Sequence, residues 1–141
     1  MALDMLARRE HSRRELRDKL VKKGCSENLA ADVVQDLEAR RLLSDGRFAE
    51  ALVQARQQKG YGPLRIRKEM QEKGVDGELI EQCIDVTDSR WVEVLRQVRH
   101  KKFGDKLPRS YQERARQARF LQYRGFTYDQ IQSVLSPSEI D

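Results

Sequence analysis

Apolar residues recur every three or four positions along most of the chain, with charged residues between them. The pattern is strongest where Trp91, Val94, Leu95 and Val98 have the i, i+3, i+4, i+7 spacing of one helix face. No segment shows the strict alternation of apolar and polar residues that is typical of a half-buried strand. The spacing therefore predicts an all-α protein.

The pattern repeats with a period of about fifty residues. The tripeptide Lys23–Cys25 aligns with Lys73–Val75 at an offset of 50, and then with Arg124–Phe126 at a further 51. The apolar positions around each central glycine coincide as well: Leu20 with Met70 and Leu121, Ala30 with Ile80 and Ile131, and Val34 with Ile84 and Leu135. Each copy predicts a helix that ends at a basic residue, a left-handed glycine, and a new N-cap two residues later.

Each repeat contains three predicted helices. The second helices begin near Ser12, Pro63 and Ser110, and Ser12 with Glu15 and Ser110 with Glu113 have the spacing of capping boxes. The third helices are short, over residues 26–39, 76–86 and 127–135. We therefore expect three tandem three-helix repeats that form an elongated array, straight or curved. The expected bounds are 1–43, 44–87, and 88–141 with an acidic C-terminal tail.

Composition and charge refine this picture. Of 141 residues, 38% are hydrophobic and 36% are charged, which predicts several thin cores and no single large core. The net charge of +5 is unevenly distributed, since residues 90–124 hold eleven Lys and Arg against three Asp and Glu, and residues 125–141 carry a charge of −3. The basic stretch is suited to phosphate or to an acidic protein groove. The alternative is a merely solvated face.

Catalytic motifs are absent from the sequence. His11 and His100 are isolated, and His11 is expected at the surface or in a helix cap. Cys25 and Cys83 align with apolar positions, so they are expected to be core residues, and their spacing forms no zinc motif. We expect no enzyme activity, no catalytic residue, no metal and no cofactor. The absence of a long apolar run and of a signal peptide predicts a cytoplasmic protein without a membrane span.

Basic residues beside aromatic ones are the candidate binding residues. Tyr61 lies between two glycines, and Tyr123 follows basic residues at helical spacing. The candidate contact residues are Tyr61, Arg65, Arg67, Lys68, Arg116, Arg119 and Arg124. Such pairs can bind phosphates and stack on bases. The alternative is structural, with Tyr61 packing a loop and Tyr123 capping a core.

The third helices argue against sequence-specific recognition of duplex DNA. In helix-turn-helix proteins the last helix of the unit enters the major groove. Here the third helices of the first two repeats are acidic, with Glu27, Asp32, Asp36 and Glu38 in one and Asp76, Glu78, Glu81 and Asp85 in the other. Nucleic-acid contacts are therefore expected from first and second helices, to the backbone.

Four ordered blocks that span nearly the whole chain resemble the signatures of the RecX family of bacterial regulatory proteins. They are Ala7–Leu16, Leu42–Ala49, Lys59–Pro63 followed by Ile66-Arg67 and Glu72–Val75, and Ala118–Phe126. The resemblance implies tandem three-helix repeats, in agreement with the period found above.

The resemblance also implies a partner. RecX proteins bind the RecA recombinase, notably its filament on single-stranded DNA, and inhibit ATP hydrolysis, strand exchange and co-protease activity. The family thereby regulates recombination, DNA repair and the SOS response, without chemistry of its own. We accordingly expect a monomer that binds RecA and is able to contact the DNA backbone. Two alternatives remain: a free-standing protein that binds the backbone of single-stranded nucleic acid, and a helical scaffold for an unrelated partner.

Overall fold

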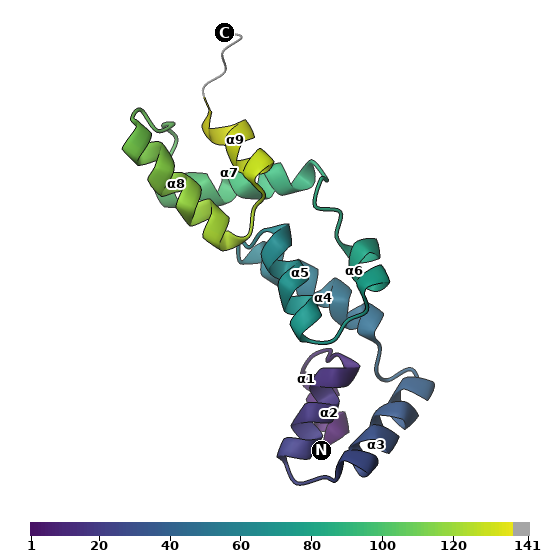
Figure 1. The fold of residues 1–141 in the computed structure, drawn as a ribbon. Coiled ribbons are helices and arrows are strands. Elements are labelled where there is room, and N and C mark those ends of the chain that lie inside the picture. The colour runs from purple at the N-terminus through teal and green to yellow at the C-terminus, as the bar shows by residue number, and fades with distance from the viewer. Residues whose placement is uncertain (137–141) are drawn as a thin grey trace. The chain divides into compact units, whose positions relative to one another are not determined.

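A computed structural model describes residues 1–136, and these residues form nine helices and no strand (Figure 1). In chain order the helices are α1 (Ala2–Arg8), α2 (Arg13–Lys22), α3 (Glu27–Ala39), α4 (Asp45–Gln58), α5 (Pro63–Glu72), α6 (Gly77–Cys83), α7 (Arg90–Phe103), α8 (Tyr111–Arg124) and α9 (Tyr128–Leu135). The prediction of an all-α fold is confirmed. The predicted acidic tail includes Glu139 and Asp141, which lie outside the described residues.

The second helix of each repeat begins where the sequence predicts. Ser12 caps α2 in a complete capping box, with its Oγ accepting from the Glu15 N–H at 3.0 Å and its own N–H donating to Glu15 Oε1 at 3.4 Å. Pro63 is the first residue of α5. Ser110 caps α8 by accepting from the Glu113 N–H. The Glu113 carboxylate instead accepts from Arg109 N–H at 3.0 Å, so the predicted second box is only half formed.

The repeated glycines have the predicted conformation. Gly24, Gly74 and Gly125 have φ values of 107°, 80° and 102°, in the left-handed region that favours glycine. The next helix then starts at a fresh cap, with Ser26 Oγ accepting from Leu29 N–H and Thr127 Oγ1 from Gln130 N–H. The nine aligned apolar positions are at most 5% exposed. The sequence period therefore reflects a repeated structure.

Helix α6 is shorter than predicted. It ends at Cys83, whereas the sequence pattern predicted a helix to residue 86. The Asp85 carboxylate accepts from the Thr87 N–H at 2.9 Å and from the Thr87 hydroxyl at 2.6 Å. This local turn competes with the helical hydrogen bonds and ends the helix early.

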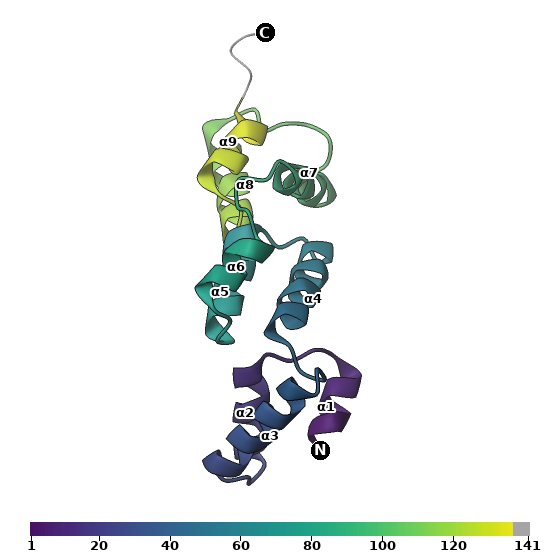
Figure 2. The same ribbon diagram turned by 90° about the vertical axis from the view of Figure 1, so that its right-hand side faces the viewer.

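The helices pack as two compact units. Unit 1 comprises residues 1–53 and 69–83, and unit 2 comprises residues 54–68 and, of the described residues, 84–136. Helices α4 and α5 are thus each divided between the units. In unit 1, α2 packs against α3 (Figures 1 and 2) around a core of Leu16, Leu20, Ala30, Val34, Leu37 and Leu43. In unit 2, α7, α8 and α9 pack against one another, and the buried residues of this part of the chain include Trp91, Leu95, Leu121, Phe126, Ile131 and Leu135.

Each unit contains one junction between successive repeats, and each junction has a hydrogen bond between equivalent positions, with a different donor group. In unit 1, Ser12 Oγ donates to the carbonyl oxygen of Lys73 at 2.7 Å. In unit 2, the N–H of Gly62 donates to the carbonyl oxygen of Arg124, also at 2.7 Å. Ser12 and Gly62 both precede a second helix, while Lys73 and Arg124 both precede the glycine that ends the second helix of the following repeat. The start of one second helix therefore contacts the end of the next.

Two of the three repeated glycines, Gly74 and Gly125, lie at these junctions. A Cβ at Gly74 would lie 2.6 Å from Arg14 Cδ, and one at Gly125 would lie 2.7 Å from Arg65 N. Gly24, which takes part in neither junction, would place a Cβ within 4 Å of no atom of the described residues. At Gly74 and Gly125 the close approach of the preceding repeat adds to the conformational need for glycine.

Candidate functional site

The loop between α4 and α5 forms the second junction and presents Tyr61. Gly62 N–H and Leu64 N–H donate to the carbonyl oxygens of Arg124 and Gly125, at 2.7 and 2.9 Å. A Cβ at Gly62 would lie 2.6 Å from both the carbonyl carbon and oxygen of Gly125. Only glycine allows the two backbones to approach so closely. The loop is thereby fixed against the end of α8.

Two arginines stack on aromatic rings around this loop. The guanidinium carbon of Arg65 lies 4.0 Å from the ring centroid of Tyr61 and 5.2 Å from that of Tyr123. The guanidinium carbon of Arg124 lies 5.2 Å from the Tyr61 ring centroid and 5.1 Å from that of Phe120. These are cation–π distances. We call these five residues the arginine–aromatic cluster.

The backbone holds both guanidinium groups of this cluster in place. Arg124 Nη1 donates to the carbonyl oxygen of Lys59 at 3.0 Å, and Arg65 Nη1 to that of Tyr123 at 3.4 Å. Tyr61 is half-buried, which agrees with packing in a loop. Tyr123 is 75% exposed, so the alternative in which it caps a core is wrong. A planar aromatic and a cation are thus presented side by side at the surface.

Further aromatic rings of α7 and α8 extend the cluster. Phe103 and Phe120 meet edge to face, with their centroids 5.4 Å apart. Lys102 Nζ lies 5.5 Å from the Phe120 ring centroid, and the Arg116 guanidinium carbon lies 5.9 Å from that of Phe103. Positive charge and aromatic surface therefore alternate from the Tyr61 loop to the end of α7.

All seven sequence-predicted contact residues lie in unit 2. The structure brings Tyr61, Arg65 and Arg124 together, and it places Arg116 beside Phe103. The other three lie on the same helices without joining the cluster: Arg67 and Lys68 on α5, and Arg119, which is exposed, on α8.

Sequence reasoning did not select Phe120, Phe103 or Lys102 as contact residues. A signal for Phe120 was present, because Arg116, Phe120 and Arg124 are spaced four residues apart and share one face of α8. Lys102 belongs to the basic stretch of residues 90–124, but its place beside Phe120, like that of Phe103, depends on how α7 packs against α8.

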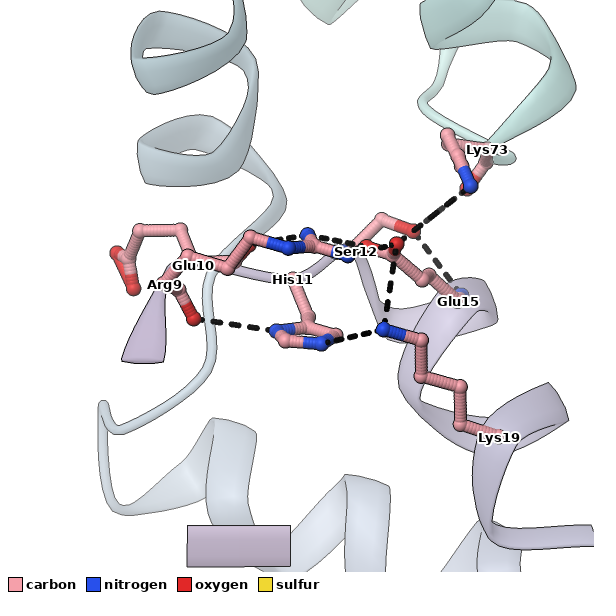
Figure 3. A network of polar contacts seen from close by, with 7 residues as sticks. All are labelled: Arg9, Glu10, His11, Ser12, Glu15, Lys19 and Lys73. Atoms are coloured by element: carbon pink, nitrogen blue, oxygen red, sulfur yellow. Dashed lines mark hydrogen bonds and ion pairs between the residues drawn. The ribbon is translucent and has the colours of Figure 1, made fainter. Parts of the chain in front are cut away.

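The second polar site lies in unit 1 and centres on a buried carboxylate (Figure 3). The Glu15 side chain is 5% exposed. Arg9 binds it through two nitrogens, Nη1 to Oε1 at 3.1 Å and Nη2 to Oε2 at 2.6 Å. Lys73 Nζ and Lys19 Nζ lie 3.5 and 3.9 Å from Oε2. With Ser12 and His11, these residues form what we call the Glu15 network.

The cations of this network decide the charge of Glu15. Burial alone raises the pKa of the carboxyl group, but the hydrogen bonds from Arg9 and the charges of Arg9 and Lys73 outweigh it and lower the pKa to about 2. The carboxylate therefore stays ionised at neutral pH. Because Lys73 belongs to the second repeat, the network supports the same junction as the Ser12 hydrogen bond.

His11 is buried at 3% exposure, so the predicted surface position is wrong. Its Nδ1 lies 3.1 Å from the carbonyl oxygen of Arg9 and its Nε2 lies 3.0 Å from Lys19 Nζ (Figure 3). A lysine ammonium only donates, so Nε2 accepts and Nδ1 carries the hydrogen. Both ring nitrogens have partners, which offsets the cost of burial. Burial, together with the charges of Arg9 and Lys19, lowers the pKa of His11.

We expect the free energy of unfolding to fall as the pH decreases through the ordinary histidine pKa of about 6.5. The reason is that the unfolded state binds a proton at His11 that the folded state binds only at lower pH. Substitution H11Q should remove part of this dependence between pH 7.5 and 5.5, measured by urea unfolding. The control is H100Q, at the exposed histidine of α7. An H11Q variant with the pH dependence of the wild type would contradict the conclusion that His11 is buried and uncharged.

Neither a metal centre nor a membrane span is found in the part of the chain that the structure describes. No group of three or more His, Cys, Asp or Glu side chains there is placed to hold a metal ion. No helix there has the length and apolar character required to cross a bilayer.

Together, the fold and its sites define a tandem three-helix-repeat protein with a basic, aromatic surface. Sequence profiles of the first, second and third three-helix domains of RecX match residues 1–37, 44–84 and 88–135. The regulatory protein RecX of Halorhodospira halophila is 40% identical over 140 residues, which cover 99% of this chain and 87% of the relative. That of Pseudomonas syringae pv. tomato is 42% identical over 135 residues, covering 96% and 87%. The chain belongs to the RecX family of regulatory proteins.

Solved structures show the same fold. The crystal structure of RecX from Lactobacillus salivarius superposes with a TM-score of 0.71 at 23% identity, covering 94% of this chain and 88% of that one. A second crystal structure, of a regulatory protein RecX, gives a TM-score of 0.75 at 16% identity, covering 94% and 66%. The predicted three-helix repeats are thereby confirmed as the architecture.

Proposed function

We propose that this protein regulates a RecA recombinase by binding RecA and its filament on single-stranded DNA. Binding inhibits ATP hydrolysis, strand exchange and co-protease activity, and so regulates recombination, DNA repair and the SOS response. The protein acts in the cytoplasm as a monomer and by occupancy, without a reaction of its own. Membership of the RecX family supports the partner, and the basic surface of unit 2 supplies a physical means of binding.

The observation that carries this proposal is the arginine–aromatic cluster, with its exposed Tyr123 ring. Arg65 stacks on both Tyr61 and Tyr123, and three quarters of the Tyr123 surface is open to solvent. An ordered guanidinium group offers bidentate hydrogen bonds to phosphate or carboxylate at little further cost in side-chain entropy. The proposed contacts to RecA or DNA are Tyr61, Arg65, Arg67, Lys68, Arg116, Arg119 and Arg124.

The tandem arrangement of the repeats is suited to binding along the groove of a RecA filament. We propose three repeat domains, over residues 1–43, 44–87 and 88–141, arranged as an elongated array that lies in the filament groove. An occupied groove hinders the addition of further RecA subunits. In this arrangement few copies of the protein affect many RecA subunits.

ATP hydrolysis by the cognate RecA on single-stranded DNA, titrated with this protein, tests the proposal. We expect inhibition well below one copy of the protein per RecA, because blocking filament growth affects many subunits. Inhibition only when the DNA is saturated would favour the second candidate. Absence of inhibition by the folded protein would refute the proposed partner.

The second candidate is a free-standing protein that binds single-stranded nucleic acid. The exposed Tyr123 ring beside Arg65 favours it, because bases stack on such rings. In that case DNA affinity alone is high, and contact with about six phosphates gives a log–log salt slope near −4. Under the RecA proposal, DNA affinity alone is modest and tight binding needs the protein filament.

Reversal of two exposed charges on α8, R116E/R119E, should raise the concentration for half-maximal inhibition of ATP hydrolysis at least about tenfold. The reversal replaces two attractive contacts with repulsive ones in the basic half of the chain. The matched control is K22E/K23E, which makes the same change in charge at exposed positions at the end of α2. Equal inhibition by both double variants would remove the basic surface of unit 2 from the mechanism.

A further inference from the structure

A pocket of about 390 Å³ lies in unit 2 beside the arginine–aromatic cluster. It is bounded by the end of α4, one face of α7 and the C-terminal half of α8, and its volume lies in the range of small-ligand sites. Its lining residues are Gln57, Gln58, Lys59, Gly60, Val94, Gln97, Val98, Lys101, Lys102, Phe120 and Arg124. We propose that it binds one nucleotide of a single DNA strand, an inference that rests on the proposed function and specifies its contact with DNA.

The charge of the pocket selects an anion. Four of its lining residues are cationic, and none of the lining residues, all of them described, is Asp or Glu. Two of these cations lie near one ring, with Lys102 Nζ 5.5 Å and the Arg124 guanidinium carbon 5.1 Å from the Phe120 centroid. A phosphate entering this region meets only positive charge from the lining side chains. The phosphate of a nucleotide therefore fits beside Lys101, Lys102 and Arg124.

The apolar and amide groups of the pocket select a base. Val94, Val98 and Phe120 provide an apolar surface, and the edge-to-face contact with Phe103 holds the Phe120 ring. Phe120 is partly exposed, so a base can contact its ring beside the two nearby cations whatever the identity of the base. Three glutamine amides, each with donors and an acceptor, can meet the polar edge of the base. A paired base is held in its stack, so a concave site of this kind favours a single strand.

The wall of the pocket is fixed by its backbone. Gly60 has φ of 86°, and a Cβ there would lie 2.8 Å from Val98 Cγ2 and 3.4 Å from Arg124 Nη1. Arg124 Nη1 is also bonded to the carbonyl oxygen of Lys59, at 3.0 Å. Glycine thus lets the loop close directly on α7, and Arg124 is oriented before any ligand arrives. Such preorganisation lowers the entropic cost of binding.

An acidic peptide would satisfy the charges of the pocket but would leave its aromatic surface and amides unused. The test therefore compares strands that differ only in their bases. An oligonucleotide of about 12 thymidines and an abasic strand of equal length carry the same phosphates. A poly-glutamate peptide of equal charge is the third ligand.

We expect the wild-type protein to bind the thymidine strand at least about fivefold more tightly than the abasic strand, the effect of one stacked base. Substitution F120L should abolish this difference, whereas Y111L, at an aromatic residue of α8 that is 78% exposed, should leave it unchanged. If F120L retains the preference for bases, or if the wild type has none, the proposal is wrong. Poly-glutamate binding as tight as that of the thymidine strand would also overturn it.

Charge variants provide an independent test, because Phe120 also packs against Phe103 and F120L alone could disturb α8. K101E/K102E should weaken binding of both strands at least about tenfold more than K106E/R109E, which makes the same change at exposed residues outside the pocket lining. Equal losses in the two double variants would contradict the site.

The same preparations are assayed for inhibition of RecA ATP hydrolysis. Inhibition by the wild type without base preference would overturn the pocket and leave the proposed function intact. Base preference that F120L abolishes, without inhibition by the wild type, would support the pocket and refute the proposed function.

Discussion

Substitution E15Q should lower the free energy of unfolding at pH 7 by about 3 kcal/mol. The carboxylate of Glu15 is buried and its pKa is lowered to about 2, against an ordinary value of 4.5, because Arg9 and Lys73 stabilise the ionised form more than burial disfavours it. Glutamine keeps the length of the side chain and can still complete the capping box with Ser12. The substitution therefore removes the charge and, because an amide nitrogen only donates, the hydrogen bond from Arg9 to one of the two oxygens.

The matched control is E113Q, at the equivalent position of α8. Glu113 also follows a capping serine by three residues, but its side chain is exposed, so we expect a loss below about 0.5 kcal/mol. Urea unfolding at several pH values adds a second criterion. The stabilisation from Glu15 is present above pH 4.5 and is lost as the pH falls toward 2, so the E15Q deficit should shrink over that interval. A deficit that is independent of pH, or no larger than that of E113Q, would show that the ionised carboxylate does not stabilise the junction.

Substitution G62A should lower the free energy of unfolding by about 2 to 3 kcal/mol. The new Cβ would lie 2.6 Å from the carbonyl group of Gly125, and backbone atoms cannot move aside as the end of a flexible side chain can. The loop must then separate from α8, which breaks the hydrogen bonds to the Arg124 and Gly125 carbonyl oxygens. The arginine–aromatic cluster depends on both segments.

The control for this prediction is G77A. Gly77 is the first residue of α6, and a Cβ there would meet no atom of the described residues within 4 Å. Alanine favours a helix over glycine, so the variant should be unchanged or up to about 1 kcal/mol more stable. Urea unfolding followed by circular dichroism measures both variants. If G62A is as stable as G77A, the close backbone contact at the second junction does not exist in solution.

The local features of the fold could be predicted because they depend on neighbours in the sequence. Caps at Ser12, Ser26 and Thr127 and the left-handed glycines are set by side-chain and backbone chemistry within one turn of helix. The aligned apolar positions are buried because the helical period brings them to one face. The early end of α6 differs from the prediction because the side-chain turn between Asp85 and Thr87 outweighs the helical pattern of residues 84–86.

The tertiary contacts could not be predicted in the same way. The sequence pattern does not indicate that Glu15 meets Lys73, because that contact depends on how the second helix meets the following repeat. It also does not indicate that His11 is buried against Lys19, although both belong to the first repeat. Tyr61 and Arg65 could be selected as candidates, four residues apart, but the approach of Tyr123 and Arg124 depends on the junction. Residue types were therefore predictable from the sequence, and their partners were not.

The junction hydrogen bonds have a consequence for how the sequence can vary. In both, the acceptor is a main-chain carbonyl oxygen, that of Lys73 or Arg124, which every amino acid possesses. Side-chain replacement at these two positions leaves the acceptor in place. Insertion or deletion of a single residue within α5 or α8 would instead rotate that carbonyl by about 100° around the helix axis, away from its donor. Each junction acceptor is thus insensitive to the side chain at its own position but sensitive to helix length.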